Sequence, residues 1–413
     1  MMKFTHKTSI LEASKLSFLI AKYSGFFPFT INFNPNELKR QVSSDFFDYV
    51  LLVISLSFSF AVSLKLEQAS LPFNLNSVIL ETGIFLVVKT STISSILIKI
   101  LNYFLKHKFA EIVYDLHWID LKVKFVVLVI ELICELLYCF LQLKCFGIEI
   151  NHQKVFIVSL ILFLGNYSFR ILEPVVMGSS LLALNIDPFN NPHINNTAMM
   201  DEILTGILVS VNVSSYMNYV AFYIVLLFAT YSRMAAINEC LRKQKFIMPS
   251  KHCDIVREMA ILHDKVCRIA ELINECFAFN LINFLLYFVF DLILFSFGVY
   301  EHLSTPNAPI EQVIMNIITL QWIVYYFVGV FWTIVIASWI KSEGKMTVKL
   351  LHELTIHNND VKLLSAVQLS TMQIVHRQPT ISVGLFNIDF ELTTLMIGAV
   401  FSYTIILVQF ESS

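Results

Sequence analysis

The sequence contains a series of apolar runs, each long enough to cross the hydrocarbon core of a bilayer. A helix rises 1.5 Å per residue, so about twenty apolar residues span that core. Eight such runs occur, at residues 46–64, 78–101, 125–143, 155–184, 203–231, 280–300, 316–340 and 390–410. Fifty-six per cent of the residues are hydrophobic, more than a soluble chain of 413 residues could bury in one or two cores. The sequence therefore predicts an all-α, polytopic membrane protein.

The run at 125–143 differs from the others. In a membrane span, Glu131 and Glu135 would lie at mid-depth on one helical face, at a cost on the order of 3 kcal/mol each. The piece 123–142 begins Val-Lys and ends Leu-Gln, its twenty codons keep the reading frame, and Val and Gln codons can encode the GT and AG that bound an intron. We hypothesise a retained intron in the gene model. The alternatives are a genuine extra span or a buried cytoplasmic helix. Without this run, seven spans remain in one domain, residues 1–413.

Basic residues are concentrated in alternate linkers. Of 29 Lys and Arg, the polar to amphipathic N-terminal tail holds six, and the linkers 102–154, 232–279 and 341–380 hold six, eight and five. The remaining loops between spans contain one, Lys65. Because basic loops stay in the cytoplasm, we expect a cytoplasmic N-terminus and an extracellular C-terminus. Asn195, in the sequon Asn-Asn-Thr, would then be extracellular and a candidate for glycosylation.

Two of the basic linkers carry a helical period. Apolar residues repeat at about 3.6 positions through 231–280, so we expect the fourth and fifth spans to continue as long helices below the membrane. Residues 359–377 form a second amphipathic stretch, with Asn359 or Asp360 as its cap and Pro379 as its stop. The linkers together predict a cytoplasmic helical domain.

The last run carries polar side chains along one face. Counting back from Gln409 by threes and fours gives Ile406, Ser402, Gly398, Leu395 and Glu391. A wall that faces lipid has no use for an amide, whereas the lining of a water-filled pore does. The pattern therefore predicts that this helix lines a pore.

Two stretches near the C-terminus resemble the signature of insect gustatory receptors. That signature reads Thr-Tyr, five apolar residues, then Gln-Phe, and residues 402–410 match it with Ser402 in place of Thr, followed by Tyr403 and ending at Gln409-Phe410. Upstream, the segment 384–389 resembles the family's Gly-x-Phe-x-hydrophobic-Asp pattern through Gly384, Phe386 and Asp389. The match lies at the end of a multi-span chain of the family's length.

This resemblance implies a function and an assembly. It implies a gustatory receptor of inverted seven-span topology in the plasma membrane of a sensory neuron, acting as a ligand-gated, non-selective cation channel. The chain would form a homotetramer, or a heteromer with related receptors, in contact with membrane lipid. Gln409 and Phe410 would form the narrow outer gate, and the cytoplasmic helices an anchor domain. The family's sugar branch carries Glu where this chain has Thr404, which leaves bitter compounds, fructose-like sugars or an internal nutrient as the tastant.

Polar and aromatic side chains inside the spans mark a candidate pocket for that small molecule. Asp291 should face inward or meet Lys89. Arg170 and Glu173 are i, i+3 neighbours, and their alternative role is to pair with each other and fix packing; Tyr and Trp near membrane ends also serve as interfacial anchors. The candidate pocket residues are Arg170, Glu173, Asn212, Tyr216, Asp291, Trp322 and Tyr325.

Other classes of site find little support. His352 and His357 are five residues apart, which turns the second ring away from the first, whereas zinc ligands on a helix need a spacing of four. We expect no metal, cofactor, nucleic acid or enzymatic activity, and no disulfide among seven cysteines assigned to cytoplasmic linkers or to 123–142. The competing function is a secondary transporter, or another multi-span membrane protein, for a small polar solute. A transporter would predict internal repeats, which the sequence lacks.

Overall fold

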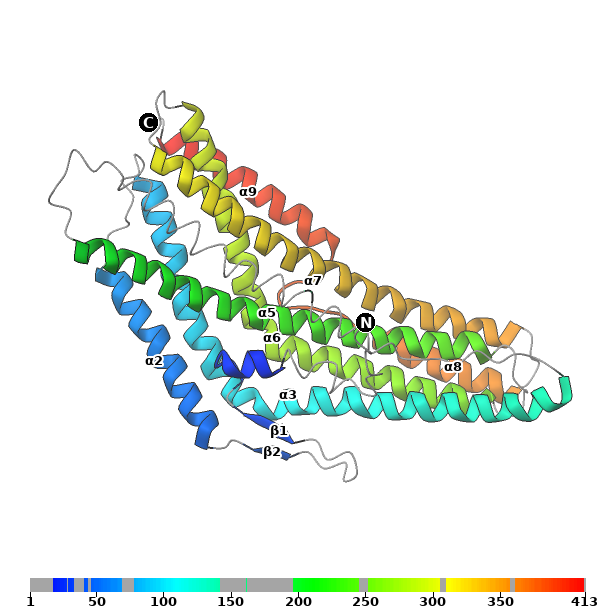
Figure 1. The fold of residues 1–413 in the computed structure, drawn as a ribbon. Helices are drawn as coiled ribbons and strands as arrows, with labels where there is room; N and C mark the ends of the chain where they lie inside the picture. Colours follow the sequence, from blue (N-terminus) through cyan, green and yellow to red (C-terminus); the bar gives the residue numbers. More distant parts are fainter. Residues whose placement is uncertain are drawn as a thin grey trace.

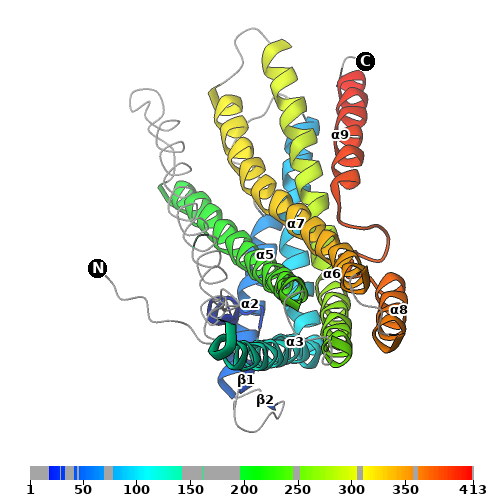
Figure 2. The ribbon, with the colours of Figure 1, turned by 90° about the vertical axis from the view of Figure 1, so that its right-hand side faces the viewer.

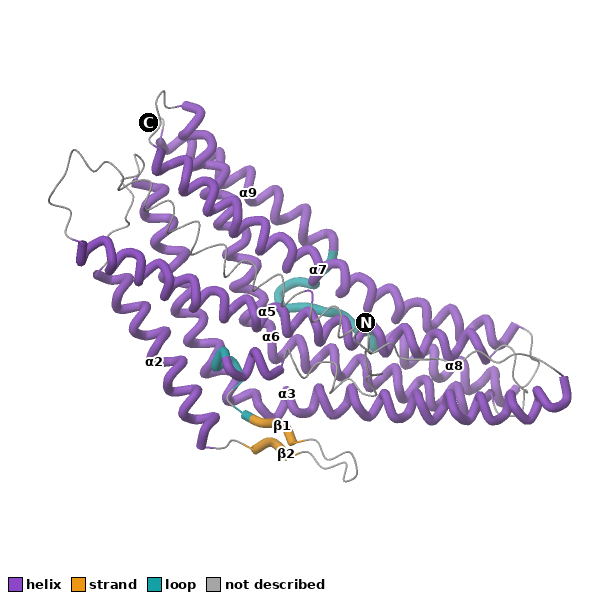
Figure 3. Tube along the Cα trace, in the orientation of Figure 1, coloured by secondary structure: helices purple, strands orange, loops and turns teal. Residues whose placement is uncertain are grey.

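The computed structural model describes residues 18–27, 29–32, 41–43, 46–68, 78–141, 161, 196–244, 252–304, 310–356 and 361–411. Within these residues the regular structure is helical apart from one hairpin, formed by the antiparallel strands β1 (Thr30–Asn32) and β2 (Gln41–Ser43), and an isolated bridge between Ser382 and Asn387 (Figure 3). The helices are α2 (Phe46–Gln68), α3 (Val78–Leu141), α5 (Asn196–Gln244), α6 (His252–Ser304), α7 (Ile310–Ile356), α8 (Val361–His376) and α9 (Phe390–Glu411). The predicted all-α class is confirmed.

Six of the described helices are long and apolar enough to cross a membrane: α2, α3, α5, α6, α7 and α9. They contain the predicted spans 46–64, 78–101, 203–231, 280–300, 316–340 and 390–410. The predicted span 155–184 lies outside the described residues except for Ile161. The prediction of a polytopic helical membrane protein is confirmed.

Four of these helices are much longer than a membrane is thick. α3, α5, α6 and α7 contain 64, 49, 53 and 47 residues, which corresponds to about 70 to 95 Å of helix against a hydrocarbon core of about 30 Å. Figure 1 shows them continuing from the group of spans into a second bundle, where α8 joins them. The long helices predicted for the 231–280 linker are therefore present, as extensions of α5 and α6.

Of the disputed run 123–142, residues 123–141 form the C-terminal end of α3, which continues without a break to Leu141. Within the described residues it forms no helix of its own. The retained-intron hypothesis concerns the transcript and stays a prediction: a message that contains these codons in every tissue would contradict it.

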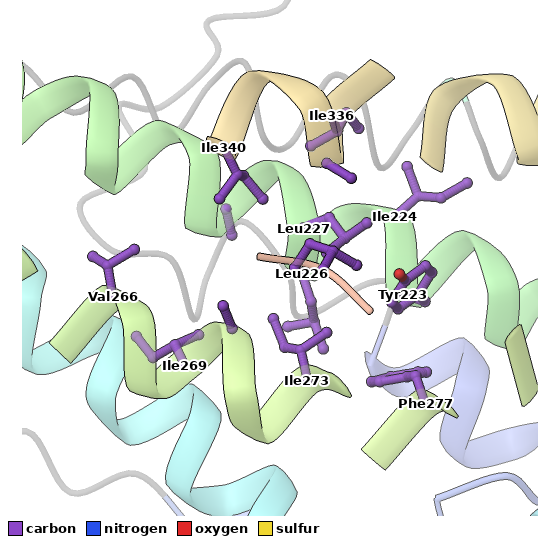
Figure 4. Packing of buried hydrophobic residues seen from close by; sticks show 14 of the residues in the cluster. Tyr223, Ile224, Leu226, Leu227, Val266, Ile269, Ile273, Phe277, Ile336 and Ile340 are labelled. Atoms are coloured by element: carbon purple, nitrogen blue, oxygen red, sulfur yellow. The ribbon is translucent and has the colours of Figure 1, made fainter. Parts of the chain in front are cut away.

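α5 is the central helix of the core. In its most apolar stretch 78% of the residues are buried, and side chains from α6 and α7 pack on opposite sides of it (Figure 4). Leu227 of α5, Ile273 of α6 and Ile340 of α7 are fully buried in this cluster. A helix that is apolar around its circumference is stable only when other elements surround it, which explains why α5 lies inside.

An aromatic segment ahead of α2 fills one side of the core, which the polar to amphipathic character of residues 1–45 did not predict. Phe26, Phe27 and Phe29 are all fully buried. The ring of Phe27 lies 4.7 Å from that of Phe109 and 4.9 Å from that of Phe222, measured between centroids. The Asn102 amide donates a hydrogen bond of 3.0 Å to the Phe26 carbonyl. The segment therefore ties α3 to α5.

A series of ion pairs joins α3 to α6 in the second bundle. The pairs are Lys108–Glu275, Glu111–Arg268, Asp115–Lys265 and Lys122–Glu258. Partner numbers fall on α6 as they rise on α3, so the two helices run antiparallel in one register. Like charges would meet if that register slipped, so the pairs specify the packing more than they strengthen it.

Candidate functional site

α9, the predicted pore helix, lies at the edge of the bundle. It packs on α6 and touches α7 slightly (Figure 2). In its most apolar stretch 11% of the residues are buried, against 78% for α5. Its inward side chains include Leu392 and Met396, which are buried, and Leu407 and Val408, which pack near Phe297. One face of α9 packs against the other helices, and most of its surface is directed away from them.

The predicted pore and gate residues all lie on that outward side. Each of them is exposed: Gly398, Ser402, Ile406, Gln409 and Phe410. A methyl group added at Gly398 would meet nothing within 4 Å. The Ser402 hydroxyl donates a 2.9 Å hydrogen bond to the Gly398 carbonyl, so it is satisfied within the helix. The stripe therefore offers a surface with a small side chain at Gly398 and an amide near the C-terminal end of α9.

The second predicted signature segment, residues 384–389, directly precedes α9 and positions its first turn. Gly384 has φ +84°, in the left-handed region, inside a tight reversal closed by a hydrogen bond of 3.1 Å from Val383 N–H to the Phe386 carbonyl. Asp389 caps α9 by accepting the Glu391 N–H at 3.2 Å, and its other carboxylate oxygen lies 3.5 Å from Lys341 of α7. Phe386 packs against the main core. These three residues thus fix where α9 begins.

Tyr403, the remaining predicted signature residue, has a different environment. It is 57% exposed on α9. Its predicted packing role would therefore need a surface other than the described part of its own chain.

The linker between α8 and α9 is fastened to both α6 and α7. The Asn274 side chain of α6 donates to the Thr380 carbonyl at 2.9 Å and accepts the Ser382 N–H at 3.1 Å. The Arg377 guanidinium binds both oxygens of Glu271, at 3.0 and 2.7 Å, and these hydrogen bonds raise its pKa. On α7, a methyl added at Gly344 would lie 2.8 Å from Pro379 Cδ. A displacement of α6 relative to α7 would therefore move this linker and, with it, the N-terminal end of α9.

Polar and aromatic side chains from four helices form a connected group that includes Asp291 of α6. We call them the Asp291 cluster: Ser94 of α3, Tyr216 of α5, Tyr287 and Asp291 of α6, and Trp322 and Tyr326 of α7. Tyr287 and Ser94 share a buried hydrogen bond of 2.7 Å between their hydroxyls. The Tyr216 and Tyr287 ring centroids are 6.4 Å apart, and those of Trp322 and Tyr326 are 6.2 Å apart. Tyr326 lies within electrostatic range of Asp291, Tyr216 and Tyr287.

The structure brings together four of the predicted pocket residues. Tyr216, Asp291 and Trp322 belong to the cluster, and Tyr325 lies next to it, 6.2 Å from Trp322 between ring centroids. Asp291 is 8% exposed, so its predicted inward direction is found, whereas Lys89 lies over the Phe85 ring at 5.9 Å from its centroid.

Other predicted residues fall outside the description. Arg170, Glu173 and Asn195 lie outside the described residues, and of Asn212 the backbone of α5 is described but not the side chain. Sequence reasoning left Ser94 and Tyr287 out of the pocket. Tyr287 could have been found, because it lies one helical turn before Asp291 on the same face. Among the described residues, no three His, Cys, Asp or Glu side chains are placed to hold a metal ion.

Comparisons with known proteins agree along nearly the whole chain. The model of the 7tm Chemosensory receptor family matches residues 15–413. Among solved structures, the chain is similar to the insect olfactory receptor OR5 from Machilis hrabei, with a TM-score of 0.67 and 12% identity over 96% of this chain and 97% of that chain. The same receptor in complex with eugenol gives 0.63 and 12%, over 97% and 98%. A comparison with curated proteins finds no match. At 12% identity, the structural similarity establishes a common fold.

Proposed function

Because the chain belongs to the 7tm chemosensory receptor family, we propose that it is a gustatory receptor that works as a ligand-gated, non-selective cation channel. As a member of a receptor family it is not an enzyme. A small tastant opens the channel, and copies of α9 line its pore. The receptor lies in the plasma membrane of a sensory neuron with its N-terminus in the cytoplasm, as a homotetramer or a heteromer with related receptors.

One observation carries the channel function: α9 leaves its polar stripe uncovered by the described part of its own chain. In hydrocarbon, an exposed amide such as that of Gln409 is costly, whereas around a symmetry axis the same amide faces water. The outward apolar residues, such as Leu395 at 69% exposure, would then contact lipid or the neighbouring copies. The gustatory type is supported by the match of residues 402–410 to that family's signature, including Tyr403.

The proposed gating step is a population shift between closed and open arrangements. A ligand at the Asp291 cluster contacts α6 and α7, and both helices hold the linker that positions α9. A preference of about 1–2 kcal/mol for the open state at each of four sites would shift the equilibrium by roughly 4–8 kcal/mol. That is enough to open a mostly closed pore. Ile406 and Phe410 would close the pore by excluding water, and Gln409 would line it when open.

Small molecules are the ligand class that the relatives support. OR5 of Machilis hrabei has been solved in complex with eugenol. For this chain, the convergence of a carboxylate with four aromatic rings supports a small polar or amphipathic tastant.

Ligand-evoked currents in cells that express only this chain test the proposal. We expect currents that Na⁺ and K⁺ carry equally well, and none from a control chain that ends after Asp389 and lacks α9. If the full chain instead takes up a polar solute without passing current, it is a secondary transporter and the channel proposal is wrong.

A further inference from the structure

We propose that the Asp291 cluster recognises a cationic ligand: a small molecule with a protonated or quaternary ammonium group on an aromatic or apolar body. The role of that ligand as an opener rests on the proposed function, whereas its binding does not. The proposal follows from a carboxylate, the rings around it and the positions of the nearby lysines.

Asp291 is a nearly buried residue, and within the described residues its carboxylate has no partner. The residue is 8% exposed, and across the described part of the chain no side chain or backbone group donates a hydrogen bond to it or forms an ion pair with it. A charge removed from water normally needs a partner, because neither lipid nor aromatic rings replace its hydration. A ligand cation would supply that partner.

Aromatic rings from three helices belong to the same cluster. Tyr216, Tyr287, Trp322 and Tyr326 come from α5, α6 and α7, with neighbouring ring centroids about 6 Å apart. The Phe284 ring extends the group, 5.5 Å from Tyr326. Ring faces attract ammonium groups through their quadrupoles, most strongly where water is excluded. A carboxylate together with several rings therefore selects a cation over a neutral molecule of the same shape.

The lysines of the neighbouring helix α3 are directed elsewhere. Lys89 lies over the Phe85 ring, 5.9 Å from its centroid. Lys99 donates to the Ser59 hydroxyl at 2.8 Å and to the Ser55 carbonyl at 3.2 Å. Both ammonium groups have contacts away from Asp291, so a ligand cation would be the group that favours the ionised form of this buried carboxyl.

The hydroxyl groups of the cluster also favour this arrangement. Tyr287 is held by Ser94, and Tyr216 donates to the Asn280 carbonyl at 3.1 Å. These bonds fix both rings without using the Asp291 carboxylate. The rings are therefore oriented before any ligand arrives, which lowers the entropy cost of binding.

Titration of the purified full-length chain in lipid nanodiscs tests the site. The probes are benzyltrimethylammonium and its neutral carbon isostere, neopentylbenzene, with binding followed by calorimetry. We expect saturable binding of the cation, at least about tenfold tighter than that of the neutral compound, corresponding to one decade in Kd. Asp291→Asn should remove that preference and leave the weak binding of the neutral compound unchanged.

The control is Ser296→Ala, on the same helix, whose hydroxyl bonds to the Leu292 carbonyl of its own helix; it should bind the cation as the unaltered chain does. Equal binding of the two probes, absence of saturable cation binding, or an unchanged cation Kd in Asp291→Asn would each overturn the proposal. Cation binding without any evoked current would leave the site standing and contradict the channel function. Currents evoked by neutral compounds alone would support the channel function and contradict the cation site.

Discussion

At the residue scale, an added Cβ should have opposite effects on stability at Gly384 and at Gly398. An added methyl group would meet nothing within 4 Å at either position. Gly384, however, has φ +84°, where a Cβ is strained, whereas Gly398 is inside α9, where alanine is the better helix former. We expect Gly384→Ala to lower the free energy of unfolding by about 1 kcal/mol and Gly398→Ala to raise it by about 0.5–1 kcal/mol. Thermal unfolding of the two purified variants measures both, and a shift of the same sign would contradict the backbone argument.

Gln409 is the residue on which the pore assignment depends most directly. Its amide should line the open pore, so we expect Gln409→Ala to change single-channel conductance or gating without loss of surface expression. The control is Gln373→Ala, which removes an exposed amide from α8 instead. Patch-clamp recording with surface biotinylation separates the two effects. Unchanged currents from a Gln409→Ala channel at normal surface level would show that this amide does not face the ion path.

At the element scale, the linker before α9 is positioned by side chains of other helices. Asn274 satisfies one carbonyl and one N–H of this linker. In Asn274→Ala both backbone groups lose their partner, at a cost of about 1–3 kcal/mol. If the linker couples the ligand site to the pore, this cost should move the half-maximal ligand concentration by about tenfold.

The matched control for that prediction is Asn283→Ala, on the same helix. Its exposed amide bonds to the Phe279 carbonyl of its own helix. Concentration–response curves of both variants provide the measurement. Equal curves for Asn274→Ala and Asn283→Ala would mean that the two Asn274 hydrogen bonds hold the linker without transmitting ligand binding.

The second bundle contains a buried ion pair between α3 and α5. Arg233 and Asp120 are 2.8 Å apart, with 0% and 3% of their side chains exposed. Arg233→Met leaves a buried carboxylate without its partner, so we expect a loss of about 3–5 kcal/mol in unfolding free energy. The double variant Asp120→Leu with Arg233→Met should recover most of this loss. Denaturant unfolding in detergent compares the two, and a double variant as unstable as Arg233→Met would argue against the charge as the cause.

At the scale of the whole molecule, the helices form two tiers, a group of spans and a bundle of their extensions (Figure 1). The extensions carry the basic linkers, which suits a cytoplasmic position. α9 ends among the spans, at the end of the molecule away from that bundle (Figure 1). The long helices thus provide a continuous mechanical link between the spans and the second bundle.

This orientation makes a direct prediction about the termini. In intact cells, antibody should label a C-terminal epitope tag but not an N-terminal one, since the proposed orientation places the N-terminus in the cytoplasm. Treatment with a glycosidase should reduce the mass of the protein, and Asn195→Gln should remove that change. An N-terminal tag labelled in intact cells would reverse the proposed topology and with it the outer position of Gln409.

Much of this fold could be predicted because its signals are local. Spans such as 46–64 and 390–410 follow from the length of an apolar run, and the extensions of α5 and α6 follow from a 3.6-residue period. The outward stripe of Gly398, Ser402 and Gln409 is likewise a matter of spacing along one helix. What the sequence by itself determined is therefore which segments form the six long apolar helices among the described residues, and which face of α9 is polar.

The tertiary structure decided which distant residues meet. Tyr287 and Ser94 are 193 residues apart in the chain. Asn274 and Thr380, which also share a hydrogen bond, are 106 residues apart. The burial of Phe27 against Phe109 and Phe222 was hidden in a tail that looks polar. Such contacts depend on how long helices cross and on their register, and neither is set by the period of one helix, because many crossings bury the same apolar faces equally well.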